Sequence, residues 1–216
     1  AASAGADWRL NDRWTLSGSL SRETYVATAR TLERGVGLAA ATATAGWTPL
    51  SSLGTRLSVQ RMETSDGNGR DLLSGYARWT LPVNRPRLAL SWNGRYLSYD
   101  DPQIGREDGY FAPDFFVANV AGFEISDTLR GRVGLSAEGT LGLQEVRVLP
   151  GSERTNDTVR GWYLRASWAI GSRVSLEAWL GRTNLALQGP AGFGSVESGI
   201  RLRWKTGWPS HGGVSR

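Results

Sequence analysis

Arginine side chains recur one at a time along this sequence, on the polar side of segments in which polar and apolar residues alternate. In the segment 53–61, for example, Leu57 and Val59 alternate with Arg56 and Ser58. Successive side chains of a β-strand point to opposite faces, so each such segment predicts a strand with one apolar and one polar face. The polar faces are predicted to carry Arg56, Arg78, Arg95, Arg132, Arg165, Arg201, Arg203, Glu138, Glu177, Tyr76, Tyr163 and Trp179.

These residue types indicate what a shared polar surface would do. Guanidinium groups around a pathway attract anions, as rings of arginine do in anion-selective pores, and aromatic faces stack on sugar rings. The arginines of this face outnumber its glutamates, which predicts that some arginines lack a partner and that anionic solutes are attracted. A second interpretation stays open, in which arginine and glutamate pair across neighbouring strands and fill a narrow barrel together with the aromatic rings.

Alternation with a period of two repeats along most of the chain and predicts the strands that position these residues. Faces can be assigned within 14–25, 53–61, 73–81, 88–96, 133–144, 162–170, 174–183 and 196–204, whereas 35–47 and 115–125 are too rich in small or apolar residues. Short connections are expected near Asn11–Arg13, Thr48–Ser52, Pro82–Pro86, Asp127–Thr128 and Gly171–Arg173. Longer ones are expected near Val26–Arg34, Glu63–Arg70, Asp100–Asp114, Pro150–Asp157 and Leu187–Gly194. Short turns at one end and longer loops at the other are typical of an outer-membrane barrel.

Two all-β architectures are compatible with this alternation, a soluble sandwich and a membrane barrel. The predicted strands have about 10–13 residues, whereas strands of soluble proteins usually have about 5–6. Aromatic residues concentrate near the strand ends, as in the girdles of membrane barrels, and the apolar faces carry almost no charge in mid-strand. We therefore predict an all-β fold, a transmembrane, antiparallel, up-and-down β-barrel of the bacterial outer membrane, with about 10–12 strands in this chain.

The barrel is expected to span residues 1–204, followed by a tail at 205–216. About eleven strands can be counted, whereas bacterial single-chain barrels have an even number. Either one segment is divided wrongly or the chain is a piece of a longer barrel. The opening residues AASAGADWRL already look like part of a strand, which favours the second alternative.

Composition argues against several other functions. The chain has no cysteine, and no metal site or cofactor is expected. The net charge is +5, but the arginines form no basic stripe, which argues against nucleic-acid binding. Hydrolytic enzymes generally need a general base, most often histidine. The one histidine, His211, lies in the tail, so the protein is predicted not to be an enzyme. The carboxylates expected in loops, which a barrel enzyme would have to use instead, are Asp100, Asp101, Glu107 and Asp108.

Three pieces of the sequence, DWRLNDRWTLSGSLSRETYVATARTLERGV, SDGNGR and EDGYFAPDFF, resemble in content and order the C-terminal barrels of exopolysaccharide-export outer-membrane proteins. The relatives meant are the poly-N-acetylglucosamine porin and the outer-membrane component of bacterial cellulose synthase. The resemblance implies a barrel that passes a polymer across the outer membrane and follows a periplasmic helical-repeat scaffold. No such repeat occurs in these 216 residues, and the chain ends in KTGWPSHGGVSR rather than on an aromatic strand residue. No functional residue is carried over, because Asp66, Gly67 and Asn68 are expected to form a turn and Tyr110–Pro113 to pack a loop.

The expected function is that of an outer-membrane channel for passive export of an exopolysaccharide through an arginine-rich lumen. The expected partners are outer-membrane lipid and lipopolysaccharide, a polysaccharide or another anionic or neutral solute, and a periplasmic helical-repeat scaffold. Two alternatives remain, a plugged structural barrel that anchors surface loops or the scaffold, and a barrel enzyme. The loop Asp100–Asp114 is expected outside the cell and the turn Pro82–Pro86 in the periplasm.

Overall fold

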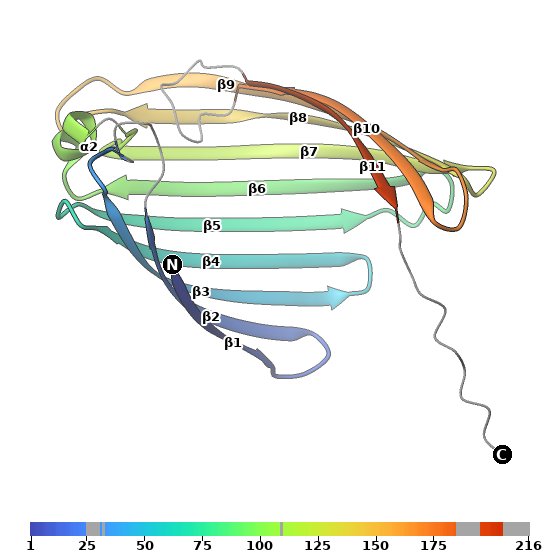
Figure 1. Ribbon diagram of the computed structural model, residues 1–216, viewed down its shortest axis with the longest axis horizontal. Coiled ribbons are helices and arrows are strands. Elements are labelled where there is room, and N and C mark those ends of the chain that lie inside the picture. The colour runs from blue at the N-terminus through green and yellow to red at the C-terminus, as the bar shows by residue number, and fades with distance from the viewer. Residues whose placement is uncertain (25–30, 32, 109, 185–194, 205–216) are drawn as a thin grey trace.

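The fold is one antiparallel sheet in which the strands neighbour one another in chain order (Figure 1). The computed structural model describes residues 1–24, 31, 33–108, 110–184 and 195–204, and these residues form eleven strands. The strands are β1 (Ala2–Arg9), β2 (Trp14–Thr24), β3 (Gly37–Leu50), β4 (Leu53–Thr64), β5 (Gly69–Thr80), β6 (Arg87–Tyr99), β7 (Phe115–Leu129), β8 (Val133–Arg147), β9 (Thr155–Ala169), β10 (Val174–Thr183) and β11 (Ser195–Trp204). They confirm the all-β, antiparallel, up-and-down architecture that the alternation predicts.

Connections alternate between two ends of the sheet, a turn end and a loop end. Residues 10–13, 51–52, 81–86, 130–132 and 170–173 join strands at the turn end, and residues 65–68, 100–114 and 148–154 join strands at the loop end. The loop predicted at Leu187–Gly194 and the tail at 205–216 lie outside the described residues, as does most of the loop predicted at Val26–Arg34.

The turn predicted at Asp127–Thr128 is misplaced, because both residues belong to β7 and the chain turns at 130–132. The Asp127 carboxylate accepts a hydrogen bond from the Thr128 backbone N–H without ending the strand (2.7 Å). Arg130 and Gly131 adopt left-handed φ angles of 49° and 66°, and this pair makes the turn.

One short helix, α2 (Pro102–Asp108), lies in the connection between β6 and β7. Its seven residues make about two turns, too few for the sequence to predict a helix of convincing length. None of the helices that the structure describes is long and apolar enough to cross a membrane.

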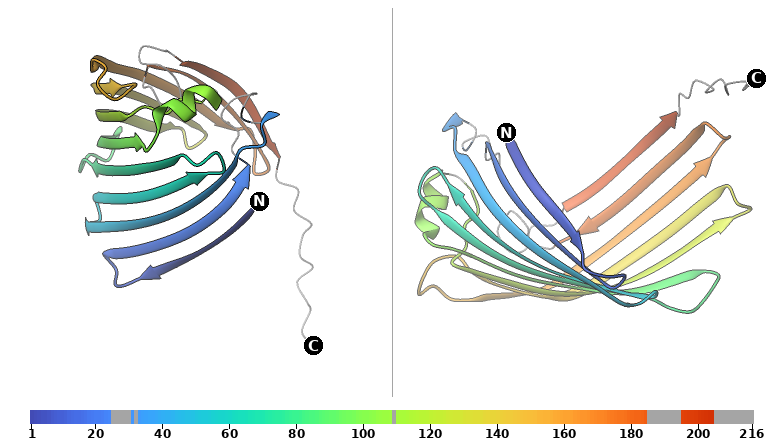
Figure 2. Two further views of the ribbon diagram at one scale, coloured as in Figure 1. Left: turned by 90° about the vertical axis from the view of Figure 1, so that its left-hand side faces the viewer. Right: turned by 90° about the horizontal axis from the view of Figure 1, so that it is seen from below.

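The sheet is curved into an open trough with β1 and β11 at its edges (Figure 2). Among the described strands, no pairing joins β1 to β11. Because every neighbouring pair is antiparallel, the first and the eleventh strand run in the same direction. Direct pairing of the two edges would be parallel, so an all-antiparallel closed barrel requires an odd number of further strands. Closure matters because each unpaired backbone group in hydrocarbon costs several kcal/mol.

The convex face of the trough is apolar and exposed. The register places Trp14 opposite Trp47 and Leu90 opposite Phe123, and all four side chains are exposed. The same arrangement continues to β10, where the exposed Leu180 lies opposite Leu164 of β9. The apolar sets predicted from alternation therefore share one outward surface, as in a barrel whose strands face lipid.

The packed core lies at the loop end of the concave face. Met62, Tyr99, Tyr110 and Ala112 form one buried cluster, and Phe116, Ala118 and Val146 form a second. Tyr110 and Ala112 belong to the connection 100–114, whereas the other buried side chains come from strands. This connection therefore lies over the inner surface of the sheet at its loop end.

Candidate functional site

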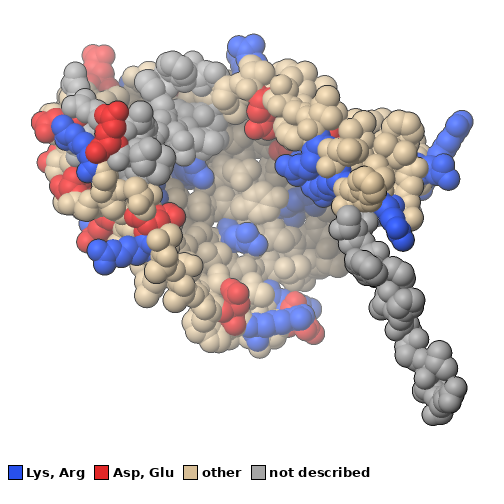
Figure 3. Space-filling view, viewed as in Figure 1, with Lys and Arg blue, Asp and Glu red and all other residues tan. Residues whose placement is uncertain are grey.

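The concave face collects nearly all of the polar-face residues predicted from the sequence. The register aligns Arg56 with Tyr76 and then with Asn93, and aligns Glu138 with Tyr163. Residues of the same face are also Arg78, Arg95, Arg165, Glu177, Trp179, Arg201 and Arg203. Figure 3 shows basic side chains within the hollow of the trough.

Arg132 is the exception among the predicted residues. It lies in the turn 130–132 that joins β7 to β8, where it is exposed, and not within a strand. The sequence places Arg132 on the polar face of β8 because it predicts the turn about three residues too early. A residue of a turn has no place on a strand face, so Arg132 is not part of the wall described below.

The strand that the sequence could not phase, β7, adds an acidic residue that sequence reasoning missed. Glu124 lies opposite Glu138 on the concave face and accepts a hydrogen bond from the Arg78 guanidinium (2.7 Å). The inner side of β7 is otherwise small or apolar, with Ala118, Val120 and Gly122. Both sides of this strand are therefore apolar along much of its length, which hid the alternation.

Ion pairs neutralise part of the inner surface. Glu177 lies between two arginines, with one oxygen 3.2 Å from Arg165 Nε and the other 3.4 Å from Arg203 Nη2. Arg56 and Arg95 make no ion pair within the described part of the chain. Both interpretations that the sequence left open thus apply to different residues, because some arginines are paired and others are not.

A cavity of about 550 Å³ lies in the middle of the trough. On one side of β7 it is lined by Arg56, Tyr76 and Arg95, and on the other by Glu138 and Glu197. Its lining thus combines hydrogen-bond donors, acceptors and aromatic surface without a catalytic arrangement of nucleophile and base. Within the described residues, no group of three or more carboxylate or histidine side chains is placed to hold a metal ion.

Residue Asn68 fixes the connection 100–114 over the inner surface at the loop end. Asn68 is fully buried, and its side-chain amide donates to the Asp101 carbonyl (2.9 Å) and to the Tyr110 hydroxyl (3.0 Å). Its side-chain oxygen accepts from the Asp101 backbone N–H (3.0 Å), and the Tyr110 hydroxyl donates to Asp66 (3.0 Å). The turn expected at Asp66–Asn68 and the packing expected of Tyr110 are thus confirmed, and they form one network.

Ion pairs hold both ends of the same connection. Arg61 donates to Asp100 (Nη1–Oδ1 3.1 Å), and Arg147 pairs with Asp114. The Arg61 guanidinium holds the pKa of the Asp100 carboxyl below its usual value. Burial raises the pKa of Tyr110 to about 12, so its hydroxyl remains a donor at neutral pH.

Comparison with known proteins supports the fold and not a family. No protein-family model matches the sequence, and neither does any curated protein. A solved structure described as a bacterial polysaccharide outer membrane secretin is similar over 94% of this chain and 69% of that chain, with a TM-score of 0.74 at 15% identity. The KdgM porin in complex with disordered oligogalacturonate is similar over 94% of this chain and 91% of that chain, with a TM-score of 0.40 at 9% identity.

The first of these likenesses is a likeness of fold. The chain has the fold of an outer-membrane β-barrel, with a sheet that is not closed within the described residues. The convex face agrees with this fold, because its exposed large side chains are apolar along the strands. The chain is thus located in the bacterial outer membrane.

Proposed function

We propose that this chain forms the wall of an outer-membrane channel that passes a saccharide polymer by passive export through an arginine-containing lumen. The observation that carries the proposal is the concave face, where arginines, aromatic rings and a cavity lie on the side opposite the lipid-facing surface. A channel wall must offer hydrogen-bond partners to a hydrated solute, and charged side chains at the narrow part bias which ions enter. The solved structure that matches with a TM-score of 0.74 bears a title that names a polysaccharide, which supports a saccharide as the cargo.

The proposal includes an orientation. Longer connections lie outside the cell in outer-membrane barrels, and short turns lie in the periplasm. The loop end with residues 100–114 is therefore the outer end, and the turn 81–86 is periplasmic. Lipid and lipopolysaccharide are the expected neighbours of the convex face, and a periplasmic helical-repeat scaffold stays a prediction from the sequence resemblance.

A transport role agrees better with this site than catalysis does. Asp100 is engaged by Arg61, and Asp101 accepts a hydrogen bond from the Gln103 backbone N–H (2.9 Å). These two carboxylates, which a barrel enzyme would have had to use, serve to hold the connection 100–114.

A plugged structural barrel is the second candidate, and the connection 100–114 favours it. Its buried contacts with Met62, Tyr99 and Phe116 narrow the inner space at the loop end. A wall of this kind anchors surface loops without conducting.

Conductance in a planar bilayer separates the two candidates. Steady ion current through the purified protein, with slower current when saccharide is added to one side, supports the channel. Insertion without current, confirmed by protease protection of the strands in vesicles, supports the plugged barrel and refutes the channel.

A further inference from the structure

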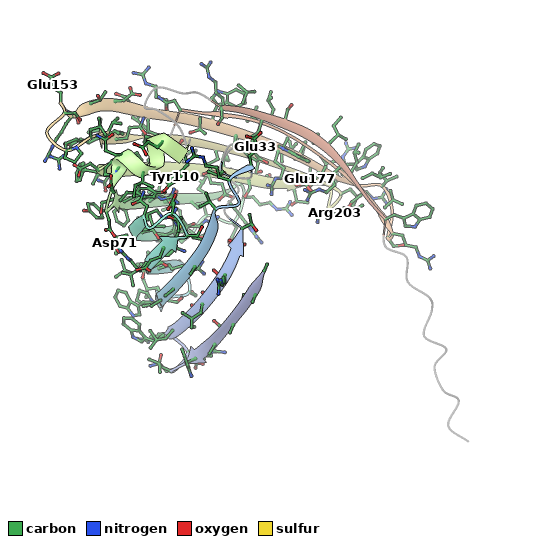
Figure 4. All side chains as sticks on the ribbon, turned by 60° about the vertical axis from the view of Figure 1, so that its left-hand side comes forward. Glu33, Asp71, Tyr110, Glu153, Glu177 and Arg203 are labelled. Atoms are coloured by element: carbon green, nitrogen blue, oxygen red, sulfur yellow. The ribbon has the colours of Figure 1, made fainter. Side chains whose placement is uncertain are left out.

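Three arginines surround one glutamate on the inner face of β9, β10 and β11. Arg165, Arg201 and Arg203 lie on β9 and β11, and Glu177 lies between them on β10. Figure 4 shows Glu177 and Arg203 next to each other on the concave side of the sheet. We call Arg165, Glu177, Trp179, Arg201 and Arg203 the β9–β11 platform.

The platform has a surplus of positive charge. Glu177 accepts from Arg165 and Arg203, and its own side chain is 17% exposed, so it is largely covered by its partners. The arginines remain open to solvent, with 51% of the Arg165 side chain and 61% of the Arg203 side chain exposed. One carboxylate cannot neutralise three guanidiniums, so donors of the platform stay available to an anionic group from the lumen.

An aromatic ring lies flat against the sheet beside these guanidiniums. A Cβ added at Gly199 would be 2.3 Å from the Trp179 ring, so the ring lies directly over this glycine of β11. The Arg201 guanidinium carbon is 5.4 Å from the Trp179 ring centroid. The arrangement is repeated one step along the sheet, where Tyr163 lies over Gly181 and the Arg165 carbon is 5.4 Å from the Tyr163 centroid.

The repeated arrangement couples two kinds of recognition. A ring that lies along the sheet presents a flat surface, and the C–H face of a sugar ring stacks on such a surface. Guanidinium groups bind carboxylates through paired, charge-assisted hydrogen bonds. A saccharide with carboxylate substituents offers both partners at once.

We propose that the β9–β11 platform binds saccharides that carry carboxylate groups, with a sugar ring on Trp179 and a carboxylate on Arg201 and Arg203. This inference rests on the proposed channel function and names its substrate class. Two acids mark the limit of the platform toward the loop end, because Glu138 and Glu197 flank Tyr163 and Gly181 in the register. A carboxylate is repelled there, which leaves the Arg201 side of Trp179 as its position.

The test compares a hexameric polyuronate with a neutral hexasaccharide on the full chain. Binding is measured by calorimetry in detergent micelles, which does not require conduction, and by current block in a planar bilayer. The wild type is expected to bind the polyuronate with at least about tenfold higher affinity than the neutral saccharide. The double variant Arg201→Gln with Arg203→Gln should lose about tenfold or more for the polyuronate and little for the neutral probe.

Matched variants separate the platform from general effects. Trp179→Ala should weaken both probes, whereas Trp168→Ala, on the lipid-facing side of β9, should weaken neither. Arg78→Gln, on the same inner face but bound to Glu124, controls for lumen charge at a distance and should leave polyuronate binding within about twofold.

The two proposals fail in different ways. Equal affinity for the two probes, or equal losses for Arg78→Gln and for the Arg201 and Arg203 pair, overturns the platform while current through the bilayer is maintained. Polyuronate binding in calorimetry without any current overturns the channel and retains the platform.

Discussion

The lipid-facing assignment of the convex face can be tested at two adjacent residues in the middle of β4. Leu57 lies on the convex face, 54% exposed, with Ala45 and Gly75 as its register partners. Ser58 lies on the concave face between Thr44 and Ser74, and its hydroxyl accepts a hydrogen bond from Thr44 (3.0 Å). The substitution Leu57→Arg places a cation on one side of the sheet, and Ser58→Arg places the same cation on the other.

The two costs follow from the neighbours of each residue. At position 57 neither Ala45 nor Gly75 offers a polar side chain, so the guanidinium meets hydrocarbon, and the free energy of unfolding falls by about 2–4 kcal/mol. At position 58 the lumen supplies water, and the loss is mainly the Thr44 hydrogen bond, worth about 0.5–1.5 kcal/mol. The difference between the variants is therefore about 2 kcal/mol.

The measurement is equilibrium unfolding in lipid vesicles, followed by tryptophan fluorescence. Leu57→Ala serves as the control that removes the leucine without adding charge. Equal destabilisation by the two arginines, or a larger loss at Ser58, would contradict the placement of lipid and lumen on these faces.

Three further predictions concern the inner surface. Asn68→Ala removes three hydrogen bonds to Asp101 and Tyr110, so residues 100–114 should become sensitive to protease and conductance should rise, whereas unchanged protection would refute the anchoring role of Asn68. The folded-state pKa of Tyr110, about 12, lies above its ordinary value of 10.0, so its contribution to stability is complete below pH 10 and is lost as the pH rises toward 12. Tyrosinate absorbance compared between the wild type and Tyr110→Phe measures this titration, and a transition near the ordinary pKa would disprove it. Arg95→Gln should shift the reversal potential toward cations and Arg160→Gln, on the convex face, should not, with the shift shrinking in molar salt, where the Debye length is about 3 Å; equal shifts would mean that Arg95 does not face the lumen.

Sequence alone was sufficient where the two faces of a strand differ in polarity. In β4, β5 and β10 each apolar residue alternates with a polar one, and a period of two has only two possible phases. The positions of Arg56, Arg78 and Glu177 on one surface follow from that phase alone. The same reasoning failed in β3 and β7, where small residues such as Ala118 occupy the inner face and leave no contrast.

Pairing between inner side chains was decided by the tertiary structure. Arg78 and Glu124 are separated by 46 residues, and the phase of β7 that brings them together cannot be read from its composition. Asn68 and Tyr110 are 42 residues apart, and the sequence assigns each of them only a local role in a turn or a loop.

The sequence by itself thus determined the strands, their two faces and the membrane class of the barrel, because alternation is a local property that each strand carries alone. Only the tertiary structure decided which arginines are neutralised, where aromatic rings lie against glycines, and that the connection 100–114 covers the inner surface. Those features depend on the register between strands and on contacts across the trough, which arise from the packing of segments far apart in the chain.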